Sequence, residues 1–131
     1  KEYSTSVDYL GPRNDVPALL SSADLFVLPS YYREGVPRVL LEAGAIGVPI
    51  ITTDMPGCKE VVCVDENGWL VPPRDAELLA ERIITALRQG RPKLKEMGKK
   101  NIKKKKKTFS LEKVADAYAN IYYDVLQSDF I

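Results

Sequence analysis

Short apolar runs that alternate with helical patterns constrain the fold of this chain more than any other feature. Residues 25–28 and 48–52 are two such runs; Pro29 follows the first and Gly47 precedes the second. Strands of a parallel sheet have this composition, because helices bury both faces of the sheet. Residues 37–46, between the two runs, have the apolar spacing of a helix. The pattern predicts βαβ units and an α/β fold, a Rossmann-like parallel sheet flanked by helices.

Capping residues and periodicity locate the other elements. Asp75 precedes a segment that places Leu79, Ile83, Ala86 and Leu87 on one helical face, so it can cap that helix. Pro92 fits the first turn of the following helix, because no hydrogen bond needs its missing N–H there. The remaining predicted elements are strands at residues 7–10 and 68–72, a helix at 16–22 capped by Asp15, the helix at 76–89 ended by Gly90, and a last helix capped by Ser110 with an apolar stripe of Leu111, Val114, Tyr118, Ile121, Tyr122 and Val125.

Length and composition narrow the class of protein. The chain has 131 residues, of which 45% are hydrophobic, so residues 1–131 can form one domain with a buried core. None of its apolar runs approaches the roughly 20 residues that cross a bilayer. Histidine is absent, which excludes His-based catalytic triads. Because the first residue is not Met, we expect a processed chain or a piece of a longer one.

Cys58 and Cys63 are the two cysteines of the chain. Four residues separate them, and neither His nor further Cys is available to complete a metal site. A disulfide framework would need more pairs. The two cysteines therefore predict reduced, structural thiols in a cytoplasmic protein.

The near-zero net charge conceals a strong asymmetry. Between Arg91 and Lys107 the chain carries ten basic residues and one acid, Glu96, which gives +9; the rest carries −8. Such a segment is either a solvated helix face or a surface for anionic lipid, and the densest part, Lys99 to Lys107, is the candidate for peripheral membrane contact. Few aromatic residues lie among the lysines to stack on bases, so no nucleic-acid partner is expected.

Residues 28–38 form the most informative junction, because a buried strand is followed by a polar loop and then by a helix. Ligands of open parallel sheets bind on such loops, beyond the carboxyl ends of the strands. The first N–H groups of a helix lack internal partners and lie at the positive end of its dipole. Pro37 stands near the first helical position, and Gly35 lets a ligand approach the backbone. A phosphate group is the expected occupant.

Two glutamates accompany this junction. Glu42 lies on the helix, more than a turn from its start, where its carboxylate can accept hydrogen bonds from a cis-diol such as ribose. Glu34 lies eight positions earlier, too far for the two carboxylates to share a proton. They are either two contacts to one elongated ligand, or a helix cap and a surface residue.

The run from Glu34 to Ala43 resembles the Glu-x7-Glu motif of the group 1 family of retaining glycosyltransferases, which have the GT-B fold. Five blocks in the family's order make this resemblance specific, and it extends from about Val7 to Tyr123. The Arg-Glu-Gly-Val-Pro-Arg variant of the motif, at residues 33–38, resembles bacterial members that elongate lipid-linked glycans such as those of lipopolysaccharide and capsule. The flanking blocks are residues 9–11, 22–30, 47–51, 57–60 and 67–73.

The resemblance implies a role for each motif residue. Glu42 would bind the ribose hydroxyls of a nucleotide-sugar donor, and Glu34, the predicted catalytic residue, would face the donor sugar. The other implied donor-binding residues are Gly35, Val36 and Arg38 through their amides, Pro37 beside them, Arg13 near the nucleobase, and Gly57 and Glu60 on a neighbouring loop. Catalysis would stabilise the departing diphosphate while an acceptor hydroxyl attacks from the same face. The resemblance implies neither a metal nor another cofactor.

The family's enzymes have two Rossmann-like domains, and this chain matches most of the second one. We expect a donor-binding domain truncated at its N-terminus, without the acceptor-binding domain and without the cations that clamp the diphosphate. Such a chain would be inactive alone, and its last helix would pack on another copy or onto the sheet. The alternatives are a domain of an epimerase or phosphorylase of the same fold, and a non-catalytic α/β nucleotide-binding module. The expected location is the cytoplasm, including the inner membrane face.

Overall fold

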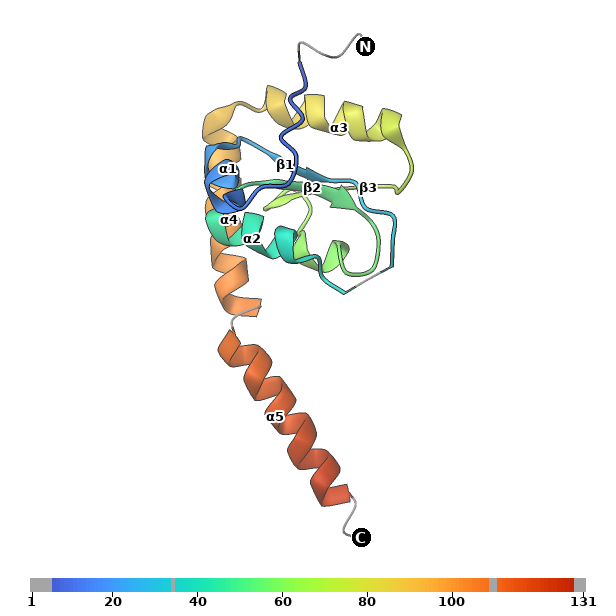
Figure 1. Ribbon diagram of the computed structural model, residues 1–131, viewed down its shortest axis with the longest axis vertical. Helices are drawn as coiled ribbons and strands as arrows, with labels where there is room; N and C mark the ends of the chain where they lie inside the picture. The colour runs from blue at the N-terminus through green and yellow to red at the C-terminus, as the bar shows by residue number, and fades with distance from the viewer. Residues whose placement is uncertain (1–5, 34, 109–110, 129–131) are drawn as a thin grey trace.

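Three parallel strands form the centre of the domain (Figure 1). Their order is β1-β2-β3, and Ile50 pairs with Phe26 on one side and with Gly68 on the other. The computed structural model describes residues 6–33, 35–108 and 111–128, without the side chains of 104–108, 111, 114, 118, 122, 125, 126 and 128. The strands are β1 (Phe26–Leu28), β2 (Ile50–Thr53) and β3 (Gly68–Val71). The predicted α/β fold with a parallel sheet is confirmed.

Helices cover both faces of this sheet. The helices that cover it are α1 (Val16–Ser22), α2 (Arg38–Ile46), the 3-10 helix η1 (Lys59–Val61), α3 (Ala76–Arg88) and α4 (Arg91–Thr108); the last helix, α5 (Leu111–Ser128), follows them. Side chains alternate between two cores: Ile50 of β2 packs with α1, α2 and η1, whereas Ile51 packs with α3 and α4. Both side chains are fully buried, as expected for a central parallel strand. The helices predicted from periodicity are confirmed to within two residues at the bounds that the structure describes.

A close crossing joins α4 to the end of α2. Gly47 ends α2 in the left-handed conformation, and Gly98 of α4 approaches it so closely that an added Cβ would lie 1.8 Å from the Gly47 carbonyl oxygen. Buried Asn101 donates a hydrogen bond of 2.8 Å to the Val48 carbonyl and accepts one of 3.3 Å from buried Asn67. Because buried amides are costly without partners, these bonds fix α4 against the sheet.

One predicted strand is wrong. Residues 7–10 form no strand, and the side chain of Tyr9 is 93% exposed. A strand requires a neighbour for its ladder hydrogen bonds, and this segment runs outside the sheet. Residues 25–28 pack against the cores on both faces of the sheet, as predicted, but their side chains are only half-buried, because β1 is an edge strand of the described sheet.

Three smaller expectations concern caps and helix faces. Asp75 accepts a hydrogen bond of 2.9 Å from the Leu78 amide, so its predicted cap is confirmed. Asp15 occupies the N-cap position of α1 without a side-chain capping bond, because its carboxylate binds Arg13. Leu87, predicted on the buried face of α3, is 50% exposed, whereas the adjacent Ala86 is fully buried.

The last helix projects away from the sheet (Figure 1). Its described apolar side chains Ile121 and Tyr123 are exposed. The predicted cap Ser110 lies outside the described residues, and of the predicted stripe the structure describes the side chain of Ile121 alone. Within the part of the chain that the structure describes, no helix has both the length and the apolar character of a membrane span.

Candidate functional site

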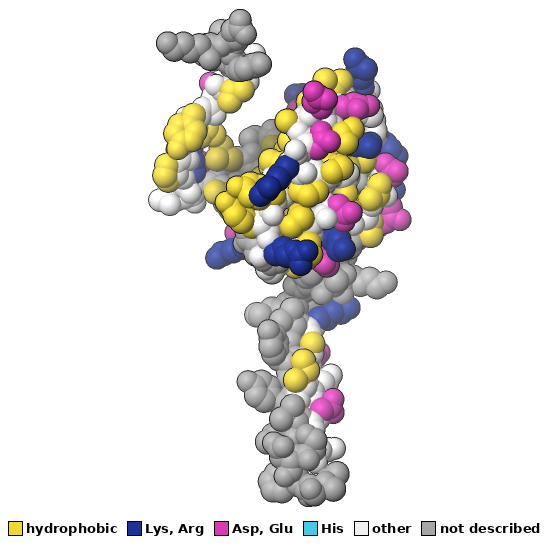
Figure 2. Space-filling model, turned by 90° about the vertical axis from the view of Figure 1, so that its right-hand side faces the viewer, with side chains coloured by type: hydrophobic (Ala, Val, Ile, Leu, Met, Phe, Trp, Pro, Cys, Tyr) yellow, Lys and Arg dark blue, Asp and Glu magenta, His cyan; other side chains and the backbone are white. Residues whose placement is uncertain are grey.

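The carboxyl ends of the three strands meet at one edge of the sheet, on the right of Figure 1. The loops that follow them start at Pro29, Asp54 and Pro72. Figure 2, which looks onto this edge, shows hydrophobic side chains gathered across the face with basic and acidic side chains between them. This is the edge where ligands of open parallel sheets bind.

Two buried threonines fasten the first loop to the end of β2. The Thr52 hydroxyl donates to the Leu28 carbonyl at 2.9 Å, and the Thr53 hydroxyl donates to the Ser30 carbonyl. Both threonine side chains are almost fully buried, so these bonds are shielded from water. The loop therefore leaves β1 in a fixed direction toward α2.

The start of α2 presents an open stretch of backbone. Pro37 occupies the N-cap position, and the Val36 side chain packs against the core beside α2. Among the described residues other than its chain neighbours, no heavy atom lies within 4 Å of the position where a Cβ on Gly35 would stand. Helix geometry leaves the first amides, including that of Arg38, without acceptors inside the helix. The predicted catalytic residue Glu34 lies outside the described residues.

Arg38 and Glu42 contact each other on the exposed side of α2. The Arg38 Nε donates to Glu42 Oε1 at 3.0 Å, across one helical turn. The Arg38 side chain is 91% exposed and that of Glu42 is 32% exposed, so a ligand can reach both. An exposed pair of this spacing contributes only about 0.3–0.5 kcal/mol to stability, so a ligand can displace Arg38 at little cost.

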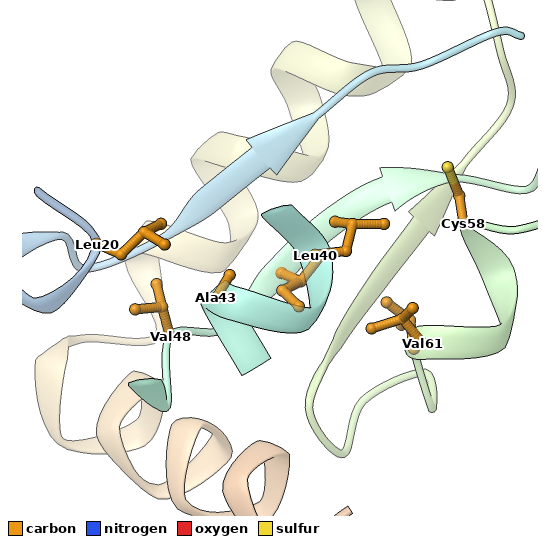
Figure 3. Packing of buried hydrophobic residues seen from close by; sticks show 8 residues of the cluster. Leu20, Leu40, Ala43, Val48, Cys58 and Val61 are labelled. Atoms are coloured by element: carbon orange, nitrogen blue, oxygen red, sulfur yellow. The ribbon is translucent and has the colours of Figure 1, made fainter. Parts of the chain in front are cut away.

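The core holds the turn after β2 next to α2. Cys58 and Val61 pack in the same cluster as Leu40 of α2 (Figure 3). Gly57, which precedes this cluster, is buried with φ of 88°. Glu60 is exposed on η1. The structure therefore places the turn that contains Gly57 and Glu60 beside the helix that carries Glu42.

Arg13 has a partner within its own loop. Its guanidinium makes two hydrogen bonds to the Asp15 carboxylate, of 2.7 and 2.6 Å. This pairing raises the pKa of Arg13 and lowers the pKa of Asp15. Both side chains are exposed, so the guanidinium stays accessible to solvent. Within the described residues, the contacts of the Arg13 side chain are with Asp15 and not with Glu42.

An apolar pocket beside the first loop was missed by the sequence prediction. Its volume is about 350 Å³, and it lies between Tyr31, the end of β3 and the start of α3. Tyr31 stacks on Tyr32 with 4.3 Å between ring centroids, and the guanidinium carbon of Arg74 lies 4.7 Å from the centroid of the Tyr31 ring. The hydroxyls of Tyr31 and Tyr32 share a hydrogen bond of 2.9 Å, which raises the pKa of Tyr32.

A signal for this pocket was present in the chain. Arg74 follows β3 in a turn of two prolines, Pro72 and Pro73, so it lies at the carboxyl end of a third strand. Its φ of 60° is uncommon for a residue other than glycine. Applying the strand-end rule to every strand, rather than to β1 alone, would have selected it.

Clusters of three or more His, Cys, Asp or Glu side chains suited to a metal ion are absent from the described residues. From the sequence we expect a reaction that needs no metal or other cofactor. That expectation stays a prediction.

Comparison with known proteins decides the family. A family model described as "Glycosyl transferases group 1" matches residues 1–105. The chain belongs to this family. The resemblance seen in the Glu-x7-Glu run is therefore confirmed at the level of the group 1 glycosyltransferases.

Two curated bacterial relatives match most of the chain. One is the N,N'-diacetylbacillosaminyl-diphospho-undecaprenol alpha-1,3-N-acetylgalactosaminyltransferase of Campylobacter jejuni, 34% identical over 125 residues, or 95% of this chain and 32% of the relative. The other is the UDP-Gal:alpha-D-GlcNAc-diphosphoundecaprenol alpha-1,3-galactosyltransferase of Escherichia coli, 31% identical over 118 residues, or 89% of this chain and 30% of the relative. The chain spans about a fifth to a third of the length of the curated relatives it matches first.

A solved structure supports the GT-B fold of this group 1 chain. The crystal structure of Anabaena HepE with UDP superposes with a TM-score of 0.84 and 25% sequence identity. The match covers 94% of this chain and 34% of HepE. The predicted GT-B-type, Rossmann-like architecture is thus confirmed.

Proposed function

We propose that the carboxyl edge of the sheet binds the nucleotide-sugar donor of a retaining glycosyltransferase, and that the donor is a UDP-sugar. The observation that carries this proposal is the open backbone from Gly35 to Arg38 at the positive end of α2, one to two turns from the accessible carboxylate of Glu42. An amide cluster suits a diphosphate, and a carboxylate suits the ribose hydroxyls. HepE, which this chain resembles, has been crystallised with UDP and with UDP-glucose.

In this proposal each motif residue binds a different part of the donor. The amides of Gly35, Val36 and Arg38 line the diphosphate, while Pro37, which has no N–H, sets the direction of the helix. Glu42 accepts hydrogen bonds from the ribose and loses its contact with Arg38 on binding. Beyond these five residues, Glu34 faces the donor sugar, Gly57 and Glu60 border the pocket from the neighbouring turn, and Arg13 leaves Asp15 to approach the base.

The proposed chemistry is electrostatic. The bond between the sugar and the diphosphate breaks while an acceptor hydroxyl forms a new bond from the same face, so configuration is retained. Helix amides stabilise the negative charge that develops on the departing diphosphate, and this stabilisation is largest where water is excluded. No residue in this proposal requires a metal ion.

The proposed acceptor is a glycan or a lipid-linked sugar. Both curated relatives named above carry a diphospho-undecaprenol acceptor in their names. Because the chain spans at most about a third of these relatives, transfer is proposed for the whole enzyme, with this chain as its donor domain. Half a cleft cannot orient two substrates, so we expect the isolated chain to bind donor weakly and to catalyse no transfer. Robust turnover by the isolated chain would contradict this expectation.

The proposed location is the cytoplasm. The observation that supports it is the free thiol of Cys58, which is buried in the core beside α2. Thiols persist in reducing compartments.

The test is a calorimetric titration of the full chain with UDP, and with inorganic phosphate for comparison. Glu42→Gln should weaken UDP binding about tenfold or more, because the ribose loses hydrogen bonds to a charged acceptor. Glu81→Gln is the matched control: it makes the same change at an exposed position on α3, outside the site, and should bind UDP as the unmodified chain does. Equal UDP affinity for both variants, or no binding of UDP, would favour a non-catalytic α/β module.

A further inference from the structure

Helix α4 carries most of the positive charge of the molecule. The segment from Arg91 to Lys107 has a net charge of +9, whereas the remaining residues sum to −8. No acid other than Glu96 occurs within this segment. The site proposed above leaves this charge without a role.

One side of α4 is fixed to the domain. Leu94 and Met97 are buried in the core beneath α3, and Asn101 is buried in its hydrogen-bond network. The helix therefore cannot rotate about its axis without breaking these contacts. Whatever lies on its opposite side is held in a constant orientation.

That opposite side carries a stripe of lysines. Lys95, Lys99 and Lys103 are exposed, and their spacing of four residues places them one above another along the helix. Glu96 lies beside this lysine stripe on the exposed side of α4, and its carboxylate pairs with Lys93 at 3.4 Å and with Lys100 at 3.5 Å. The field of these lysines lowers the pKa of Glu96. Among the residues that the structure describes, Lys95, Lys99 and Lys103 form no ion pair with an acidic side chain.

The lysine stripe lies away from the candidate donor site. The start of α4 borders the amino ends of β1 and β2, where Arg91 pairs with Asp24 at 3.2 Å. Figure 1 shows α4 on the side of the domain opposite the carboxyl ends of the strands. A surface bound to α4 therefore leaves the donor site open.

We propose that the lysine stripe of α4 docks this domain on an anionic lipid bilayer. A bilayer touches one side of the molecule, so the net −8 of the remainder can face away from it. A long nucleic acid is disfavoured, because α4 contains no aromatic residue and its lone arginine is paired with Asp24. The proposal does not rest on the proposed function.

The test is co-sedimentation of the full chain with large vesicles. One set is pure phosphatidylcholine, and the other is an equal mixture of phosphatidylcholine and phosphatidylglycerol. We expect binding to the anionic vesicles at about 0.1 M salt, loss of binding near 1 M salt, where the Debye length falls to about 3 Å, and no binding to the neutral vesicles. Binding to neither set at low salt, or equal binding to both, would overturn the proposal.

Matched variants locate the contact. Lys99→Gln with Lys103→Gln should weaken partitioning to anionic vesicles roughly thirtyfold, because each lysine near such a surface contributes about one decade or slightly less. Arg82→Gln with Arg88→Gln removes the same charge from α3 and should change partitioning less than threefold. Lys99→Arg with Lys103→Arg should retain binding, which separates charge from folding. Equal losses for the α3 and α4 glutamine variants would overturn the assignment to the lysine stripe.

Two further measurements complete the design. UDP affinity should be unchanged in the Lys99→Gln, Lys103→Gln variant, because the lysine stripe is remote from the donor site. A thirty-nucleotide single-stranded DNA serves as the competing polyanion. If the DNA binds more tightly than the anionic vesicles at equal salt, the partner is nucleic acid and the bilayer proposal is wrong.

Discussion

Individual glycines in this domain differ in what surrounds them, and this difference determines their tolerance to substitution. Gly98 faces the backbone of Gly47, so that an added methyl group would meet a carbonyl oxygen that cannot move aside. Gly35 faces open space at the candidate site. The same residue type therefore supports packing at one position and ligand access at the other.

Substitution of the two glycines by alanine should have opposite consequences. Gly98→Ala should lower the free energy of unfolding by about 3 kcal/mol, because overpacking separates α4 from α2. Gly35→Ala should change it by less than about 0.5 kcal/mol but should weaken UDP binding, because its methyl group narrows the approach to the helix amides. Urea unfolding and UDP titration measure the two effects. A stable Gly98→Ala variant would contradict the described crossing.

At the scale of elements, two aspartates occupy equivalent N-cap positions with different contacts. The Asp75 side chain accepts from the Leu78 amide at the start of α3, whereas Asp15, at the start of α1, binds Arg13 instead. Asp75→Ala should cost about 1 kcal/mol in the free energy of unfolding. Asp15→Ala should cost less than half as much, because it removes only an exposed ion pair. If urea unfolding gives equal losses of unfolding free energy for the two variants, the capping bond of Asp75 adds no more stability than the exposed ion pair of Asp15.

Much of this element structure is predictable from the chain. The apolar run at residues 48–52 indicates a central strand, and Asp75 and Gly47 mark helix ends through local chemistry. The strand predicted at residues 7–10 fails because pairing depends on a neighbour, which four residues cannot reveal. The prediction that Leu87 is buried fails for a related reason. Periodicity shows which face of a helix is apolar, but the packing of neighbouring helices determines how much of that face is buried.

The candidate site also contains residues that the sequence predicts and contacts that it does not. Glu42 and the open backbone at Gly35 follow from a contiguous motif, so sequence alone could identify them. The pocket beside Tyr31 forms where the loops after β1 and β3 meet, with Arg74 placed over the tyrosine ring by tertiary structure. The position of Arg74 after a strand is visible in the sequence, but its contact with Tyr31 is not, because the two loops are distant in the chain.

At the scale of the whole molecule, α5 leaves the domain with exposed Ile121 and Tyr123. Two partners are predicted for this helix, the sheet and a second copy of the chain. Figure 1 shows the helix away from the sheet, so the first prediction is wrong. The other, a second copy of the chain, stays a prediction. Light scattering of the full chain should give the mass of a dimer, and Ile121→Asp with Tyr123→Asp should give that of a monomer. A monomeric unmodified chain would contradict this expectation.

The central claim is that a nucleotide diphosphate binds at the carboxyl edge of the sheet, at the start of α2. Amide chemical-shift mapping of the isotope-labelled full chain during a titration with millimolar UDP tests it most directly. The account predicts saturable shifts at Gly35, Val36, Arg38 and Glu42, with none along Lys95 to Lys103 at the opposite side of the domain. Shifts confined to the lysine helix, or no shifts at the start of α2, would contradict it.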